Sequence, residues 1–403
     1  MSQASQIIGT RRTGDARVIG LVSAAHFVSH IYILVLPPLF AFVRADYGVS
    51  YTELGIALAA YNVVSAAFQT PAGFLVDWLG ARILLIGGLV LGAVAFAIAG
   101  LVDSFWVLVA MFAVVGLANT TFHPADYALL SHHVSASRIS RAFSVHTFAG
   151  MLGSAVAPGS LLLMQNQWGW RGAFIGTAVL GVVVAAILAL QREDQPAHTP
   201  ETKPRAAEAG TPAGWRLLMA PAILLNMVFF IVLALISGGI NNYSIVALSA
   251  LYGTPPVTAN AALSAYLLLS AVGVLIGGAV ATYTTRHGLV TAFGLLATAI
   301  ATLLIANFDF RPFLLILVMS VGGFFSGAIM PSRDMIVREA TPPGSFGKVF
   351  GFVSTGFNIG GVVSPLIFGA LMDHGSPRWV FLLVAAFNLI AIATVVTRPA
   401  RRD

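Results

Sequence analysis

The chain has 403 residues, of which 58% are hydrophobic and 9% charged, and its formal net charge at pH 7 is +6. A soluble domain carries charge on about a quarter of its residues, so this composition excludes a soluble globular protein and makes the lipid bilayer the main solvent. The chain has no cysteine, which excludes disulfides and thiolate metal sites.

Apolar stretches long enough to cross the hydrocarbon layer as a helix, which takes about 20 residues, recur along the whole sequence. We therefore expect an all-α membrane protein with twelve transmembrane helices. The predicted spans lie near residues 17–43, 51–76, 82–102, 105–130, 138–164, 170–190, 217–247, 257–284, 288–307, 311–335, 345–372 and 377–397.

Lys and Arg are distributed unevenly among the segments that connect these spans. Of the 21 basic residues, 17 fall at the two ends of the chain or in the even-numbered gaps. Cytoplasmic segments collect Lys and Arg, so this pattern predicts that both termini are cytoplasmic. The net charge is then a topology signal, and no basic run is long enough to indicate nucleic-acid binding. The exceptions are Arg44, Arg171, Arg311 and Arg378.

The longest polar stretch divides the chain into two sets of six spans. It covers residues 191–216, is rich in proline and mixed charge, and is predicted to be a cytoplasmic linker between bundles at 1–190 and 217–403. A shift of 207 residues aligns prolines and glycines of the two halves. Such a duplication predicts two pseudo-symmetric six-helix bundles, with the substrate site between them near the midplane.

The loop between the second and third predicted spans carries a recognisable motif. It reads Gly73-Phe-Leu-Val-Asp77-Trp-Leu-Gly80-Ala-Arg82. This stretch resembles the signature loop of the major facilitator superfamily, although Trp78 stands where a basic residue is usual. Gly73 permits close helix contact, and Gly80 permits a tight turn. The resemblance implies two six-helix bundles that rock against each other.

A second similarity lies in the first half of the chain. The run His26-Phe-Val-Ser-His30, which leads to Pro37-Pro38, and the later Phe122-His123-Pro124 are similar to the fosmidomycin-resistance-type and related bacterial transporters. This resemblance implies a multi-pass protein of the bacterial inner membrane. The sequence shows no catalytic constellation and no nucleotide-binding glycine loop, so we expect a transporter that is not an enzyme and uses no cofactor.

Charged residues near the signature loop are predicted to hold the cytoplasmic side shut. Asp77 lies at a helix C-terminus, where a negative charge is unfavourable unless another group compensates it. Asp126, near the cytoplasmic end of the fourth span, is assigned to the same network, and a buried proton carrier is its alternative role. The predicted cytoplasmic gate comprises Gly73, Asp77, Gly80, Arg82, Asp126, Arg141, Arg333 and Asp334.

Ionisable residues inside the predicted spans are almost all histidines, and such residues are functional candidates because they are costly to bury in lipid. His26 and His30 share one face of the first span, while His123 and His146 lie on the fourth and fifth. Imidazole, with an unperturbed pKa near 6.5, can load and release a proton near neutral pH. Neutral polar residues complete the predicted cavity: Asn62, Gln69, Asn119, Asn226, Asn241, Asn242, Tyr243, Tyr266 and Asn358.

These features favour a secondary transporter of a small polar or amphipathic molecule, with proton-coupled efflux by antiport as the first interpretation. Proton-coupled uptake of a small organic anion is the alternative, although no Lys or Arg falls clearly at mid-membrane. Divalent metal-ion transport through the histidines is a further alternative, for which no certain carboxylate ligand is present. The expected partners are a small-molecule substrate, protons and the lipid bilayer, and the protein is expected to act as a monomer.

Overall fold

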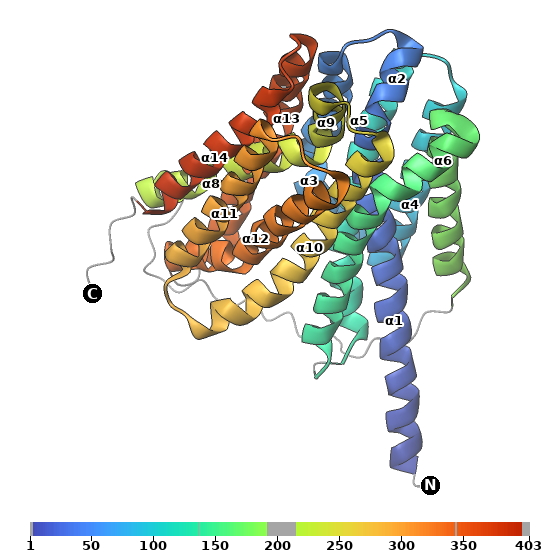
Figure 1. Cartoon of the computed structure of the whole chain (residues 1–403). Coiled ribbons are helices and arrows are strands. Elements are labelled where there is room, and N and C mark those ends of the chain that lie inside the picture. Colours follow the sequence, from blue (N-terminus) through green and yellow to red (C-terminus); the bar gives the residue numbers. More distant parts are fainter. Residues whose placement is uncertain (1–2, 136, 192–214, 343–344, 397–403) are drawn as a thin grey trace. The chain divides into compact units, whose positions relative to one another are not determined.

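The computed structural model describes residues 3–135, 137–191, 215–342 and 345–396. These residues form helices and no strand, which confirms the predicted all-α class (Figure 1). The elements are α1 (Gln3–Ile33), η1 (Pro37–Leu39), α2 (Phe40–Tyr47), α3 (Tyr51–Leu79), α4 (Ala81–Leu101), α5 (Phe105–His133), α6 (Ile139–Leu190), α7 (Trp215–Leu218), α8 (Pro221–Gly238), η2 (Gly239–Tyr243), α9 (Ser244–Tyr252), α10 (Pro256–Tyr283), α11 (His287–Asn307), α12 (Pro312–Glu339), α13 (Phe346–Asp373) and α14 (Arg378–Val396).

The helices occupy all twelve predicted positions along the described chain. Ten helical segments are long and apolar enough to cross a membrane. One of them, α6, has 52 residues and is broken at Gly169, where a φ of 73° separates the predicted fifth and sixth spans. Glycine suits this position because it adopts positive φ without steric cost. The predicted second span corresponds to α3, and most of the predicted linker lies outside the described residues.

The helices repeat at the interval that the sequence predicts. Helix α5 begins at Phe105 and α12 at Pro312, which is 207 residues later, and α6 and α13 begin at the same interval. An internal proline removes a backbone hydrogen bond and bends a helix. These four helices each contain one at the matching position, so paired helices share their bend points: Pro124, Pro158, Pro331 and Pro365.

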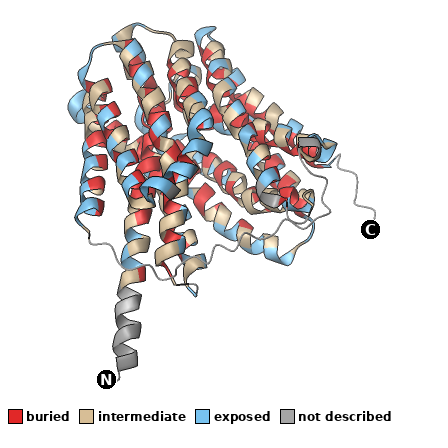
Figure 2. Ribbon diagram, turned by 180° about the vertical axis from the view of Figure 1, so that it is seen from behind, coloured by how far each residue is buried: buried red, intermediate tan, exposed pale blue. Residues whose placement is uncertain are grey.

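The chain packs as two compact units, one made of Met1–Val35 and Val63–Pro204 and the other of Leu36–Asn62 and Arg205–Asp403. In the first unit, α1 and α4 each pack against α5 and α6. In the second, α10 packs on α12, α8 packs on α13 and α14, and α11 packs on α12 and α14. Buried residues line the helix faces that meet within each unit, and exposed residues lie on the outer faces (Figure 2).

The segment 36–62 belongs to the second unit, although the predicted boundary places it in the first bundle. The Asp373 carboxylate, at the end of α13, accepts hydrogen bonds from the backbone N–H groups of Tyr51 and Thr52 at 2.7 and 2.8 Å. The Thr52 hydroxyl donates a third bond to it at 2.6 Å. Asp373 thus caps the N-terminus of α3, where an anion is favoured, and this cap ties the start of α3 to the second-half helices.

The seventh span changes its helical form at Gly238 and Gly239, which are adjacent in the sequence. Residues Gly239–Tyr243 form a π-helical turn between α8 and α9. The glycines also serve packing, because a Cβ on Gly238 would overlap the Ser364 hydroxyl and one on Gly239 would overlap Val384 and Phe368. The Tyr243 hydroxyl, at the end of the turn, donates to the Pro365 carbonyl at 2.6 Å. The turn is therefore held against α13.

Candidate functional site

Four imidazoles from three helices of the first unit lie together. The His26 ring centre lies 4.6 Å from that of His30, one helical turn further along α1. It also lies 5.1 Å from the ring of His123 on α5 and 3.8 Å from the ring of His146 on α6. His26 and His146 are buried, whereas His123 is exposed and gives the group access from outside the unit. The structure therefore brings together the four histidines that the sequence selects.

Two glycines of α6 make room for these rings. A Cβ on Gly150 would lie 2.5 Å from His26 Cδ2 and 2.8 Å from His30 Nε2. One turn later, a Cβ on Gly153 would lie 2.2 Å from the Phe27 carbonyl oxygen. A carbon that close overlaps its neighbour, so the missing side chains let α6 approach α1. This approach stacks His146 on His26.

Asp126, which the sequence analysis assigned to the cytoplasmic gate with a buried proton carrier as its alternative role, lies in this cluster. Its side chain is fully buried, with Oδ2 3.2 Å from His26 Nδ1 and 3.8 Å from His146 Nε2. The reason is helical geometry: Asp126 follows His123 by three residues, so both side chains lie on nearly the same face of α5. That spacing was the signal in the sequence that could have placed it correctly.

The cluster holds more polar atoms than it can pair. Among the described residues, no hydrogen-bond partner is present for five buried atoms: His26 Nδ1, both carboxylate oxygens of Asp126 and both ring nitrogens of His146. His30 Nδ1 is paired with the Ser154 hydroxyl at 2.9 Å. A buried charge or polar group without a partner is costly, so this group is suited to gaining and losing a small cation.

The same side chains could hold either a proton or a metal ion. Nitrogen atoms of His26, His123 and His146 all lie within 4.8 Å of one another. Zinc takes imidazole nitrogens at about 2.0–2.1 Å in tetrahedral sites, so these atoms would have to close inward around an ion. Asp126 supplies the carboxylate that the sequence interpretation lacked.

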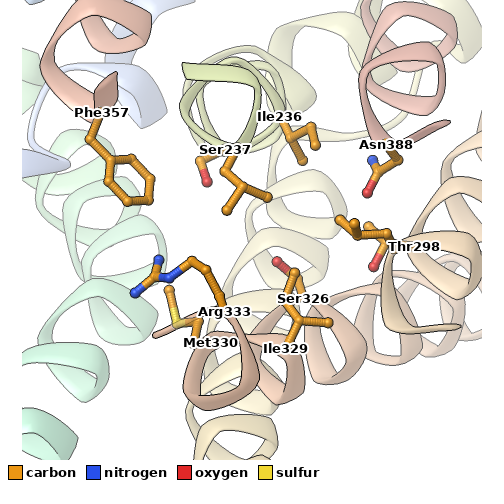
Figure 3. A pocket seen from close by; sticks show the side chains of 11 residues that line it. Ile236, Ser237, Thr298, Ser326, Ile329, Met330, Arg333, Phe357 and Asn388 are labelled. Atoms are coloured by element: carbon orange, nitrogen blue, oxygen red, sulfur yellow. The ribbon is translucent and has the colours of Figure 1, made fainter. Parts of the chain in front are cut away.

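A second group of polar residues lines a pocket in the other unit (Figure 3). Its lining side chains come from α8, α11, α12, α13 and α14, and its volume is about 40 Å³. The polar ones are Ser237, Thr298, Ser326, Arg333 and Asn388. Arg333 is the only residue of this set that the sequence selected, and it was assigned to the gate. The structure places it in the pocket wall, and its role in the gate stays a prediction.

Arg333 is held by one carboxylate and two aromatic rings. Its Nε and Nη2 atoms lie 2.9 and 2.8 Å from Oδ1 of Asp334, the other predicted gate residue in this half. The guanidinium carbon lies 4.9 Å from the centre of the Phe230 ring and 5.4 Å from that of Phe357. These contacts fix a cation in a partly buried position.

The neutral residues predicted for the second-half cavity lie elsewhere in the described structure. None of them lines the Arg333 pocket. Asn226 is buried and donates to the Ala222 carbonyl at 3.0 Å, and Tyr266 packs at Gly323 of α12. Asn241, Asn242 and Tyr243 belong to the π-helical turn, and Asn358 lies on α13. Of the first-half residues, Asn62 bonds its own helix at Leu58, and Gln69 and Asn119 are half-buried on α3 and α5.

The family of the chain follows from a comparison with known families. The family model of the Major Facilitator Superfamily matches residues 22–254 and 229–403, which together cover nearly the whole sequence. The chain belongs to the Major Facilitator Superfamily. It is therefore a multi-pass membrane protein of a transporter family and is not an enzyme.

Relatives within the Major Facilitator Superfamily differ in how much of the chain they match. The "Probable L-galactonate transporter" of Escherichia coli K12 is 29% identical over 143 residues, which are 36% of this chain and 32% of that protein. The "Probable sulfoacetate transporter SauU" of Cupriavidus necator is 24% identical over 95% of this chain and 93% of its own length. A bacterial homolog of the lysosomal transporter Spinster, solved in an inward-facing, unoccupied conformation, matches with a TM-score of 0.78 at 14% identity. It covers 96% of this chain and 99% of that one, and it shows the fold alone.

The superfamily's signature loop joins α3 to α4. Gly80 has a φ of 88°, which agrees with the predicted tight turn, whereas Gly73 has open space around it and makes no close helix contact. The Arg82 guanidinium donates to the carbonyls of Leu188, Ala189 and Gln191. It therefore caps the C-terminal end of α6, where a cation is favoured.

The roles of Asp77 and Arg141 in the cytoplasmic gate remain a prediction. The Asp77 side chain lies outside the described residues, and Arg141 is exposed on α6. The neighbouring Arg138 lies 3.7 Å from Asp15, which also accepts a hydrogen bond from the Ser135 hydroxyl. The N-terminal part of α1 is thereby attached to the segment between α5 and α6.

Proposed function

We propose that this protein is a proton-coupled transporter for the uptake of a small organic anion, with His26, Asp126 and His146 as its proton site. The observation that carries the proton coupling is the Asp126 carboxylate. It is fully buried, and among the described residues its ion-pair partners are the imidazoles of His26 and His146 and no Lys or Arg.

The physical argument rests on the cost of a buried charge. An ionised carboxylate in apolar surroundings is unfavourable unless a cation pairs with it, and a proton is the smallest cation that can do so. A proton held between Asp126 and His26 would neutralise the carboxylate and supply a donor to atoms that now lack one. The other titratable groups facing the cluster are His30, His123 and Tyr127.

Uptake by symport is favoured over the efflux that the sequence suggests first. The proposed proton site and the Arg333 pocket share no residue, so a proton and a solute can be bound at the same time. Symport requires such joint occupancy, whereas direct competition for one site is the simplest basis for antiport. The relatives named for L-galactonate and sulfoacetate are named for organic anions, which supports an anion as the solute.

The remaining assignments follow from the charge distribution and from the site. The sorted Lys and Arg residues support a bacterial inner-membrane protein with both termini in the cytoplasm. A monomer is the proposed functional unit. The domain boundaries at 190 and 217 are retained as the proposed division between the two bundles.

Proton coupling is tested by flux in proteoliposomes with an imposed pH gradient. Labelled galactonate and sulfoacetate are the solutes, and the readouts are gradient-driven accumulation and counterflow without a gradient. We expect Asp126→Asn to lose accumulation and to keep counterflow, because the solute site is unchanged. The control is Asp103→Asn, which removes an exposed carboxylate paired with Arg171. Wild-type accumulation in Asp126→Asn would rule out this proton site.

An infrared measurement tests the proton site without any solute. Difference spectra between about pH 5 and 8 detect the absorption of a protonated carboxyl group. We expect this signal in the wild type and in Asp103→Asn, and we expect its loss in Asp126→Asn. Its persistence in Asp126→Asn would assign the proton to another carboxyl group.

Metal-ion transport is the outcome that would replace this proposal. Titration calorimetry with zinc or nickel chloride distinguishes the two, because a metal site made of these histidines would bind the ion tightly and release protons. Tight binding that disappears in both His26→Gln and Asp126→Asn would make the cluster a metal site. We expect no such binding.

A further inference from the structure

The pocket beside Arg333 has polar groups of two kinds on opposite sides (Figure 3). Arg333 projects from α12 on one side, near Phe357 of α13. Asn388 projects from α14 on the other side, near Thr298 of α11. Between them lie Ser326 and apolar side chains. The pocket therefore offers a fixed cation at one end and an amide at the other.

The cation is paired within the protein through one carboxylate oxygen. The Nε–H hydrogen bond and the Nη2 ion-pair contact of Arg333 both go to Oδ1 of Asp334, and the side chain of Asp334 is 45% exposed. A guanidinium presents a fork of donors that matches both oxygens of a carboxylate or a sulfonate. The acid group of a solute can therefore replace the single oxygen of Asp334 with a bidentate pair.

The Asn388 side chain has a paired amide nitrogen and, among the described residues, an unpaired amide oxygen. Asn388 Nδ2 donates to the Val384 carbonyl of its own helix at 2.8 Å. Its Oδ1 is buried, has no hydrogen-bond partner, and belongs to a residue with no exposed surface. An amide oxygen accepts hydrogen bonds and cannot donate them. The group that it lacks is thus a donor such as a hydroxyl.

We propose that this pocket is the solute-binding site and that it selects an organic anion carrying at least one hydroxyl group. The acid group binds Arg333, and the hydroxyl donates to Asn388 Oδ1. A volume of about 40 Å³ holds roughly three water-sized groups, so the pocket takes one end of the solute. This inference rests on the proposed function, because it names the solute class of the same transporter.

Binding in detergent without a gradient tests the inference separately from proton coupling. The probes are glycerate and gluconate, their hydroxyl-free counterparts propionate and hexanoate, and uncharged glycerol, each measured by calorimetry. We expect the hydroxy acids to bind about two- to tenfold more tightly than their counterparts, as one hydrogen bond gives. Glycerol should not bind. Equal binding of hydroxylated and hydroxyl-free acids, or no binding of any acid, would overturn the inference whatever the flux assays show.

Variants then locate the two contacts. Arg333→Gln should weaken binding of every acid by roughly tenfold or more, whereas Arg338→Gln, on the same helix outside the pocket, should not. Asn388→Leu should abolish only the preference for hydroxy acids, and Asn388→Ser, which keeps an acceptor, should retain part of it. Asn260→Leu is the matched control, since Asn260 also donates to its own helix and has an unpartnered Oδ1. A preference unchanged in Asn388→Leu would contradict the inference.

One variant should improve binding, which damage to the structure would not do. Asp334→Asn removes the internal carboxylate that occupies the Arg333 guanidinium. We expect the affinity for glycerate to rise several-fold, because the solute no longer competes with a neighbouring anion. An unchanged or weaker affinity would mean that the acid group does not bind at Arg333.

Discussion

The cluster of four histidines with Asp126 and the pocket beside Arg333 occupy equivalent sequence positions in the two halves of the chain. A shift of 207 residues places Arg333 on Asp126, so the same position of paired helices α5 and α12 carries opposite charges. The same shift pairs His30 with Ser237, which lines the Arg333 pocket. It also pairs Gly150, which leaves room for imidazoles, with Phe357, which packs near the guanidinium.

This difference indicates how one duplicated framework can support the two proposed sites. Among the described residues, the cluster around Asp126 contains titratable groups and no Lys or Arg, so its charge would change on binding a proton. The Arg333 pocket contains a guanidinium that is paired with Asp334, together with neutral amide and hydroxyl groups, so it suits the proposed solute anion. The shared helix positions set where each site lies, and the side chains at those positions set what it binds.

The largest expected effect is the separation of the two functions by mutation. Asp126→Asn should lower gradient-driven accumulation by about 100-fold, since a permanently neutral side chain removes the buried proton site, and should change glycerate affinity by less than about twofold. Arg333→Gln should reverse this pattern, with weak binding and an intact protonated-carboxyl signal in the infrared. Flux, calorimetry and infrared spectra are measured on both variants. If each variant impaired both functions equally, the two sites would not be independent.

A smaller effect distinguishes the geometry of Arg333 from its charge. Arg333→Lys keeps the positive charge but loses the planar fork, so affinity for glycerate should fall about tenfold while proton coupling is unchanged. The control, Arg338→Lys, makes the same change on α12 outside the pocket. Calorimetry measures the affinity and the pH gradient assay measures the coupling. Wild-type affinity in Arg333→Lys would show that the pocket attracts anions by charge alone.

The sequence predicted the fold, and it selected some of the residues that make up each candidate site. Hydrophobic length and the 207-residue repeat gave the helix positions, because span length is fixed by the bilayer. The histidines were found because ionisable residues are rare inside spans. Asp126 and Arg333 were identified as functional but assigned to a gate, since distance from a span end does not tell which way a side chain points.

The residues that sequence reasoning missed are ordinary ones in unusual surroundings. Asn388 is one of several asparagines in the predicted spans, and what sets it apart is the buried oxygen without a partner. Ser237 and Ser326 resemble many hydroxyl residues that bond their own helix backbone. Their place in the pocket depends on which faces of α8 and α12 meet, and that packing cannot be read from one sequence.

A structural variant tests why the first half can hold imidazoles. Gly150→Ala adds a carbon that would overlap the His26 and His30 rings, so it should lower the free energy of unfolding by about 1–3 kcal/mol. Gly87→Ala, in α4, is the control because its added carbon has open space around it, and it should be neutral or slightly stabilising. Denaturant unfolding in detergent measures both. Equal stability of the two variants would show that the rings move aside at no cost.

The smallest expected effect concerns His30, which the sequence ranked among the main proton carriers. His30 lies beside His26, but its Nδ1 is paired with the Ser154 hydroxyl, whereas His26 lies 3.2 Å from the Asp126 carboxylate. His30→Ser copies Ser237, its counterpart in the second half, and should lower gradient-driven accumulation by about two- to threefold, which is the weak end of what one ordinary hydrogen bond gives. His26→Gln should lower it by tenfold or more, because removing one partner of the buried His26–Asp126 ion pair leaves the carboxylate uncompensated. If His30→Ser lowered accumulation more than His26→Gln did, the proton would reside between His30 and Ser154, and Asp126 would not carry it.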